Sequence, residues 1–119
     1  MGVRLDMFAT EDSPRTCGLG ELIFQKYDMG AEMYVVLDGQ VELTIDSKVL
    51  EVLGPGEPFG EMALIDQVPR TATATAKTPC KLAVISEKRF LFMVQQTPSF
   101  ALQIMKVMAD RLRKMNERL

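Results

Sequence analysis

The sequence predicts a mainly β fold, a small antiparallel β-roll or jelly-roll barrel followed by two C-terminal helices. Three observations predict it. Apolar residues follow a period of two, in short runs, from Leu19 to about Ile85. Glycine and proline separate these runs about every 8–12 residues, which is typical of small barrels and sandwiches. After Ile85 the apolar spacing becomes that of helices.

Strands are predicted first, between Leu19 and Ile85. Four runs suit strands by their β-forming or alternating side chains: residues 33–37, 41–45, 71–76 and 81–85. Asp38-Gly39 separates the first two runs and predicts a tight hairpin, because glycine adopts a positive φ without steric cost. Pro55-Gly56 marks a second turn. The β-roll is therefore expected over about 19–85.

Two helices are predicted after the last strand. Ser86 suits the N-cap of the first helix, which we expect over about 86–96. Pro98 interrupts the helical pattern and disfavours a helical Thr97. Because proline also suits the first turn of a helix, the final helix is expected over about 98–119.

The final helix carries an apolar seam with spacings of three and four residues. Its members are Ala101, Met105, Met108, Leu112, Met115 and Leu119. Phe100, Ile104 and Val107 widen the apolar surface only in the first half, which we expect to pack on the barrel. The narrow second half suits a partner helix or a ligand lid. A homodimer or protein partner is therefore expected through Met105, Met108, Leu112 and Met115.

Composition limits the function classes. The 119 residues, 47% hydrophobic and 25% charged, suit one soluble globular domain over 1–119. A net charge of −2 argues against direct nucleic-acid binding over the whole surface, although residues 100–119 carry +3 and the remainder −5. That basic helix is interpreted as a solvated face. The absence of histidine excludes His-based catalysis and His-ligated metals, so neither an enzyme nor a metal site is expected.

The cysteines and the N-terminus bear on location. Cys17 and Cys80 match no zinc or redox spacing and are interpreted as reduced thiols of a cytoplasmic protein. The first ten residues lack the apolar region of a signal peptide, and Asp6 breaks the myristoylation pattern. No stretch approaches the roughly 18 apolar residues of a membrane-spanning helix.

One segment carries candidate binding chemistry. Gly60 precedes a short apolar helix, residues 61–64, whose unpaired N–H groups can bind an anion. Arg70 follows a short loop, and its planar guanidinium suits two phosphate oxygens. Glu61 would repel an anion unless the ligand also carries hydroxyl donors, as ribose does. These residues indicate a phosphorylated ribose; a surface turn with an incidental Glu and Arg is the alternative.

The segment FGEMALIDQVPRTATATA (residues 59–76) resembles the phosphate-binding cassette of the cyclic nucleotide-binding domain family. That family includes bacterial catabolite activator proteins, regulatory subunits of cyclic-AMP-dependent kinase, cyclic-GMP-dependent kinases and cyclic nucleotide-gated channels. Its pattern, FGE-[LM]-A-[LI] and then R-[TSA]-A, matches at every position. The resemblance implies a cassette over 59–72, with a helix inserted between strands, followed by the family's B and C helices. Lys26-Tyr27-Asp28 departs from the family's E-G-D turn, and 10–20 is expected as loop.

The resemblance also implies roles for individual residues. Glu61 would accept a hydrogen bond from the ribose 2′-hydroxyl, Arg70 would pair with the cyclic phosphate, and Thr71 would contact phosphate or base. The backbone of Gly60, Met62 and Ala63 would contact ribose or phosphate, and Phe59 and Ala72 complete the expected ligand-binding set. Lys114, Met115 and Asn116 fall where relatives cap the base. A structural Glu–Arg pair in an empty pocket remains the alternative.

These expectations together describe a regulatory sensor. It would bind cAMP or cGMP without other cofactors, and closure of the C-helix about a hinge near Phe90 and Pro98 would be its output. A fragment of a larger transcription factor, kinase or channel is one alternative. A nucleotide-free β-roll dimerisation module is the other.

Overall fold

The computed structural model describes residues 8, 11 and 13–117. The elements follow one another in the order β1 (Arg15–Cys17), β2 (Leu22–Phe24), β3 (Glu32–Asp38), β4 (Val41–Ile45), β5 (Lys48–Leu53), β6 (Pro58–Phe59), α1 (Glu61–Asp66), β7 (Thr73–Ala76), β8 (Cys80–Ser86), α2 (Glu87–Gln96) and α3 (Ser99–Glu117). The predicted order of strands, an inserted short helix and two final helices is confirmed.

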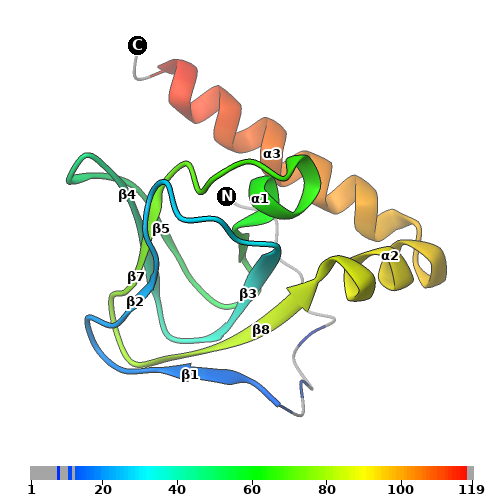
Figure 1. Cartoon of the computed structure of the whole chain (residues 1–119), viewed down its shortest axis with the longest axis horizontal. Helices are drawn as coiled ribbons and strands as arrows, with labels where there is room; N and C mark the ends of the chain where they lie inside the picture. Colours follow the sequence, from blue (N-terminus) through cyan, green and yellow to red (C-terminus); the bar gives the residue numbers. More distant parts are fainter. Residues whose placement is uncertain (1–7, 9–10, 12, 118–119) are drawn as a thin grey trace.

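The strands form two four-stranded sheets, in the orders β1-β8-β3-β6 and β2-β7-β4-β5. All their pairings are antiparallel, which confirms the predicted β-roll class. Figure 1 shows the roll on one side of the molecule, with α3 crossing above it and α2 following the end of β8. A turn at Asp38-Gly39 joins β3 and β4, and Gly39 has φ +86° there. The predicted hairpin is wrong, because β3 and β4 belong to different sheets and do not pair with each other. The turn instead carries the chain from one sheet to the other.

The structure differs from the expectation at the N-terminal edge. Strand β1 lies within the segment expected as loop, ahead of the start expected for the roll. Cys17 is buried and lies opposite Cys80 of β8 in register. The sequence does not predict this strand, because three residues are too few for an alternating pattern and two of them, Arg15 and Thr16, are polar.

Two hydrophobic clusters form the core. One lies between the sheets and draws side chains from both of them, including Phe24, Tyr34 and Phe59. The other lies between the outer face of the β3-β8 sheet and the helices. Strand β3 serves both, because successive side chains point to opposite faces. Phe100, Ile104 and Val107 are buried, which confirms that the first half of α3 packs on the roll.

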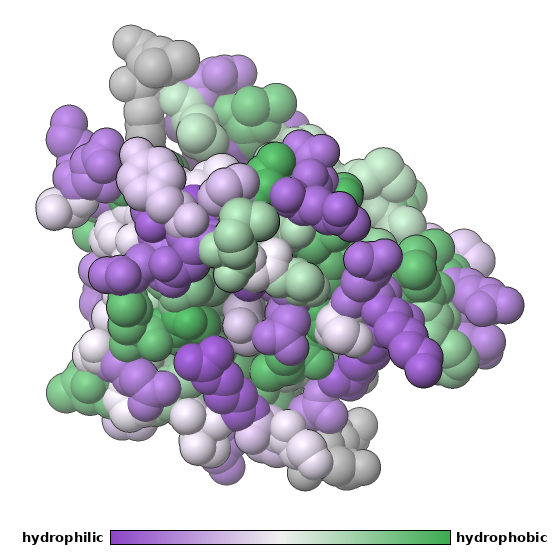
Figure 2. All heavy atoms as spheres, in the orientation of Figure 1, coloured by the Kyte–Doolittle hydropathy of each residue, from purple (hydrophilic) through white to green (hydrophobic). Residues whose placement is uncertain are grey.

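The remaining part of the α3 seam has mixed surroundings. Met105 and Leu112 are 57% and 61% exposed, whereas Met108 is partly buried. Leu119 lies outside the described residues. Figure 2 shows hydrophobic atoms among hydrophilic ones at the edge where Figure 1 places α2. Leu91 and Phe92 of α2 are exposed. Among the described residues of the seam, Met105, Leu112 and Met115 are thus exposed.

Candidate functional site

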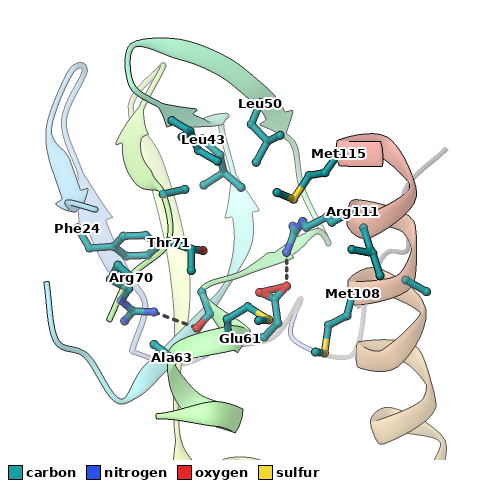
Figure 3. A pocket seen from close by; sticks show the side chains of 16 residues that line it. Phe24, Leu43, Leu50, Glu61, Ala63, Arg70, Thr71, Met108, Arg111 and Met115 are labelled. Carbon is teal, nitrogen blue, oxygen red and sulfur yellow. Dashed lines mark hydrogen bonds and ion pairs between the residues drawn. The ribbon is translucent and has the colours of Figure 1, made fainter. Parts of the chain in front are cut away.

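A cavity of about 500 Å³ opens between the roll, the start of α1 and the second half of α3. Its lining comprises Phe24, Leu43, Ile45, Leu50, Gly60, Glu61, Met62, Ala63, Arg70, Thr71, Ala72, Met108, Ala109, Arg111, Leu112 and Met115. Figure 3 shows Arg70 and Glu61 near α1, with Leu43, Leu50 and Met115 at the other end. The cavity therefore has a charged end and an apolar end.

Arg70 is fixed at the charged end. Its Nη1 donates to the carbonyl of Gly60 at 2.9 Å, and its Nη2 donates to the carbonyl of Glu32 at 2.8 Å. The guanidinium lies over the ring of Phe24, 4.2 Å from the centroid. A Cβ added at Gly30 or Gly60 would meet a guanidinium nitrogen at 2.6 or 2.8 Å. Both glycines thus make room for this one side chain.

The charge of Arg70 has no carboxylate partner among the described residues within ion-pair distance. Its contacts are carbonyls and aromatic rings, and the residue is only 5% exposed. Burial lowers the pKa of the guanidinium below its ordinary value, because removal from water disfavours the charged form. A buried cation without an anion is costly, so this end of the cavity is electrostatically suited to an anionic ligand.

Glu61 begins α1 and is 3% exposed. Its Oε1 is paired with Nη1 of Arg111 on α3. Arg111 also donates to the carbonyl of Pro58, and its Nε donates to Oε2 of Glu51 at 3.1 Å. Glu61 therefore pairs with Arg111 in this structure and not with Arg70. Figure 3 shows the two arginines directed to different groups.

Arg111 is a site residue that the sequence did not predict. The sequence pattern places it only among the bases of a solvated helix face. A usable signal is its spacing, because Arg111 lies three residues after Met108 and four before Met115, and such residues share a helix face. All three side chains line the cavity.

Apolar side chains form the other end of the cavity. Leu43, Ile45 and Leu50 belong to β4 and β5, while Leu112 and Met115 come from α3. Thr71, the exposed residue just after Arg70 in the chain, contributes a hydroxyl group to the adjoining wall. A flat, mostly apolar group fits such a slot, because its burial replaces contact with water.

The structure brings together most of the predicted cassette residues. The following line the cavity: Gly60, Glu61, Met62, Ala63, Arg70, Thr71 and Ala72. Phe59 is the exception and does not belong to the lining. Pairing of β6 with β3 places its ring against Tyr34 in the core, with centroids 5.2 Å apart, and leaves it 0% exposed. Phe59 therefore supports the site from beneath.

The three expected base-capping residues separate. Met115 lines the apolar end of the cavity. Lys114 does not; its Nζ lies 3.4 Å from Oε1 of Glu51 and 3.2 Å from Oδ2 of Asp110. Asn116 is exposed and also lies outside the lining. Successive residues of a helix point about 100° apart, so one of three neighbours faces the cavity.

Metal-binding and membrane-spanning features are absent from the described part of the chain. Residues 8, 11 and 13–117 contain no cluster of three His, Cys, Asp or Glu side chains arranged to hold a metal ion. Over the same residues, no helix has the length and apolar character needed to cross a membrane.

Comparison with known proteins places this geometry in a family. The sequence model described as the cyclic nucleotide-binding domain matches residues 14–97. The cyclic AMP receptor protein of Thermus thermophilus is 34% identical over 100 residues, covering 80% of this chain and 46% of the relative. The cAMP-dependent protein kinase regulatory subunit of Yarrowia lipolytica is 41% identical over 68 residues, covering 57% of this chain and 18% of the relative.

Solved structures agree with the sequence matches. The crystal structure of the Thermus thermophilus catabolite activator protein superposes with a TM-score of 0.82 at 31% identity, covering 95% of this chain and 55% of that one. The chain thus spans about half the length of the first curated relatives it matches. On the family match, the shared roll and the cassette geometry, the chain belongs to the cyclic nucleotide-binding domain family of regulatory proteins.

Proposed function

We propose that this chain binds a 3′,5′-cyclic nucleotide in the cavity, with the cyclic phosphate at Arg70. The observation that carries the proposal is a buried guanidinium, fixed by two carbonyls and two glycines, without a carboxylate partner among the described residues within ion-pair distance. A phosphodiester supplies one negative charge and two free oxygens, which the remaining edge of a guanidinium can bind. The backbone N–H groups at the start of α1 add donors beside it.

In this proposal, Glu61 binds the ribose. Its Oε1 is paired with Arg111, and its Oε2 accepts the hydrogen bond from the ribose 2′-hydroxyl. Arg111 has a positioning role, because its contact with Oε1 fixes the orientation of a buried carboxylate. The charged end of the cavity thus combines a cation for phosphate with an anion for a hydroxyl.

The purine occupies the apolar end. Leu43, Ile45, Leu50 and Met115 would contact its faces, and the Thr71 hydroxyl is the polar side chain available on the wall. An apolar slot favours adenine, which carries fewer polar groups to desolvate, whereas a hydroxyl beside the phosphate suits the amino group of guanine. Both cAMP and cGMP therefore remain candidate ligands, and no other cofactor is part of the proposal.

Ligand binding acts on the position of α3, and that position is the regulatory signal. Met108, Leu112 and Met115 form the helical wall of the cavity, so a bound purine would favour conformations with α3 closed over it. The α2–α3 junction near Pro98 supplies the hinge. A homodimer or protein partner reading the seam at Met105 and Leu112 stays part of the proposal, as does a role within a larger regulator, which the half-length match to relatives favours.

We propose binding and not catalysis as the role of the site. Glu61 is the acidic side chain of the site. It pairs with Arg111 and, in this proposal, binds the ribose. Direct nucleic-acid binding is not part of the proposed role, and location in the cytoplasm stays a prediction.

Isothermal titration calorimetry with cAMP and cGMP tests the proposal. Wild type should bind at least one of them at one site per chain. Arg70→Ala should weaken binding by about 2–4 kcal/mol, the scale for removing one member of a buried charge pair. Absence of binding by a folded wild type would favour the nucleotide-free module, and normal binding by the variant would remove Arg70 from the phosphate site.

A further inference from the structure

Glu51 on β5 contacts two positively charged side chains of α3. Its Oε2 accepts from Nε of Arg111 at 3.1 Å, and its Oε1 lies 3.4 Å from Nζ of Lys114. The Glu51 side chain is 12% exposed, that of Arg111 is 15% exposed and that of Lys114 is 38% exposed. One carboxylate thus joins the edge strand of a sheet to two positions on the second half of the helix.

A bulge in β5 places Glu51 there. In the pairing of β4 with β5, Leu43 is opposite Glu51 and Thr44 is opposite Val49, so Leu50 is an additional residue in β5. Bulges change the direction in which neighbouring side chains point. As a result Leu50 lines the cavity while the adjacent Glu51 contacts α3.

We infer that Glu51 is a positioning residue that holds α3 closed over the cavity and thereby sets the affinity for the ligand. This inference rests on the proposed function. The same α3 segment carries Met108, Leu112 and Met115, the helical wall of the apolar end. It also carries Arg111, which reaches Glu61 only while α3 stays close to the roll. Release of α3 would therefore open the cavity and loosen Glu61.

The energetics follow from the population of the closed form. A ligand that requires the closed form binds with an apparent dissociation constant equal to its intrinsic value divided by the fraction of chains already closed. Glu51 does not line the cavity, so it acts on binding through that fraction and through Arg111, which reaches Glu61 only in the closed form. A partly exposed ion pair changes such an equilibrium by up to about fivefold, and the more buried pair with Arg111 adds to it.

The test compares Glu51→Gln with Asp110→Asn. Both changes neutralise a carboxylate that contacts Lys114, but Asp110 belongs to α3 itself and does not tie the helix to the roll. Hydrogen–deuterium exchange of residues 108–117 in ligand-free protein measures opening, and stopped-flow release of a fluorescent cAMP analogue measures ligand retention. Glu51→Gln should speed both by about five- to tenfold, whereas Asp110→Asn should leave both within about twofold of wild type.

Unchanged exchange in Glu51→Gln would overturn the inference, as would faster exchange with unchanged release of the analogue. If folded wild type binds no cyclic nucleotide, the proposed function and the affinity role both fail, and exchange still decides whether Glu51 holds α3. Should Glu51→Gln fail to fold, Lys114→Met gives the same comparison from the helix side. Its control is Arg113→Met, since Arg113 pairs with Asp110 on the same helix.

Discussion

Gly30→Ala offers a way to displace the guanidinium of Arg70 without changing any residue that lines the cavity. An added Cβ would stand 2.6 Å from Nη2, 2.8 Å from Nε and 2.9 Å from Cζ of Arg70. Gly30 does not have a positive φ, so its backbone accepts alanine. The movable atoms are the far end of a long side chain, and the variant should therefore fold while Arg70 shifts.

The magnitude follows from the hydrogen bond that the shift breaks. Nη2 of Arg70 would move away from the carbonyl of Glu32, to which it donates at 2.8 Å, and the charge facing the phosphate would be misplaced. A hydrogen bond to a charged group contributes about 1.5–3 kcal/mol. We expect cyclic nucleotide affinity to fall by about 2 kcal/mol, which is roughly 30-fold at 25 °C.

Calorimetry of wild type and four variants measures this effect. Gly18→Ala is the matched control, because an added Cβ there meets nothing within 4 Å and its φ is not positive. Gly30→Ala, Arg70→Ala and their combination form a double-mutant cycle with wild type. In the Arg70→Ala background, Gly30→Ala should cause no further loss, because the side chain that it displaces is gone.

Two results would refute the reasoning. Wild-type affinity in a folded Gly30→Ala protein would show that the position of the guanidinium does not govern binding. An equal loss in the presence and absence of Arg70 would show that Gly30 acts through the backbone or directly on the ligand.

Three further predictions address other groups. Glu61→Gln should abolish most of the discrimination between cAMP and its 2′-deoxy analogue, about 1.5–3 kcal/mol in wild type by calorimetry; unchanged discrimination would remove the ribose role. Thr71→Ala should weaken cGMP by about 1 kcal/mol and leave cAMP nearly unchanged; equal effects on both would assign the hydroxyl to phosphate. Burial raises the pKa of Cys80 from 9.0 to about 11, so the native state retains a proton that the unfolded state loses. In urea unfolding, the Cys80 thiol should leave the unfolding free energy unchanged below about pH 9. Between about pH 9 and about pH 11 it should lower the unfolding free energy by about 2 kcal/mol. Cys80→Ala should flatten this decline, and an identical decline in that variant would assign it to other groups.

Much of the site is predictable because its residues are consecutive. Gly60 to Ala63 and Arg70 to Ala72 form one short segment whose local pattern carries its own geometry, and all of them line the cavity. The helices are predictable for a similar reason, since caps and apolar spacing are local. Ser86, for example, accepts from the N–H of Arg89 at 3.2 Å, as expected for the N-cap.

The part that is not predictable depends on tertiary structure. Arg111 and Glu61 are 50 residues apart, and only the packing of α3 on the roll makes them partners. Glu51 reaches α3 because of a bulge that shifts the register between Leu43 and Thr44, and no local pattern indicates that bulge. The motif assigns Phe59 to the ligand, whereas strand pairing buries its ring in the core.

The central claim is that a cyclic nucleotide binds in this cavity, with its phosphate at Arg70. A ¹⁵N NMR titration of the wild-type chain with cAMP and cGMP tests it most directly. The account predicts saturable shifts of the Arg70 Nε–H and of the amides of Gly60, Met62 and Ala63. A titration that leaves these signals unchanged, or moves only signals remote from the cavity, would contradict the account.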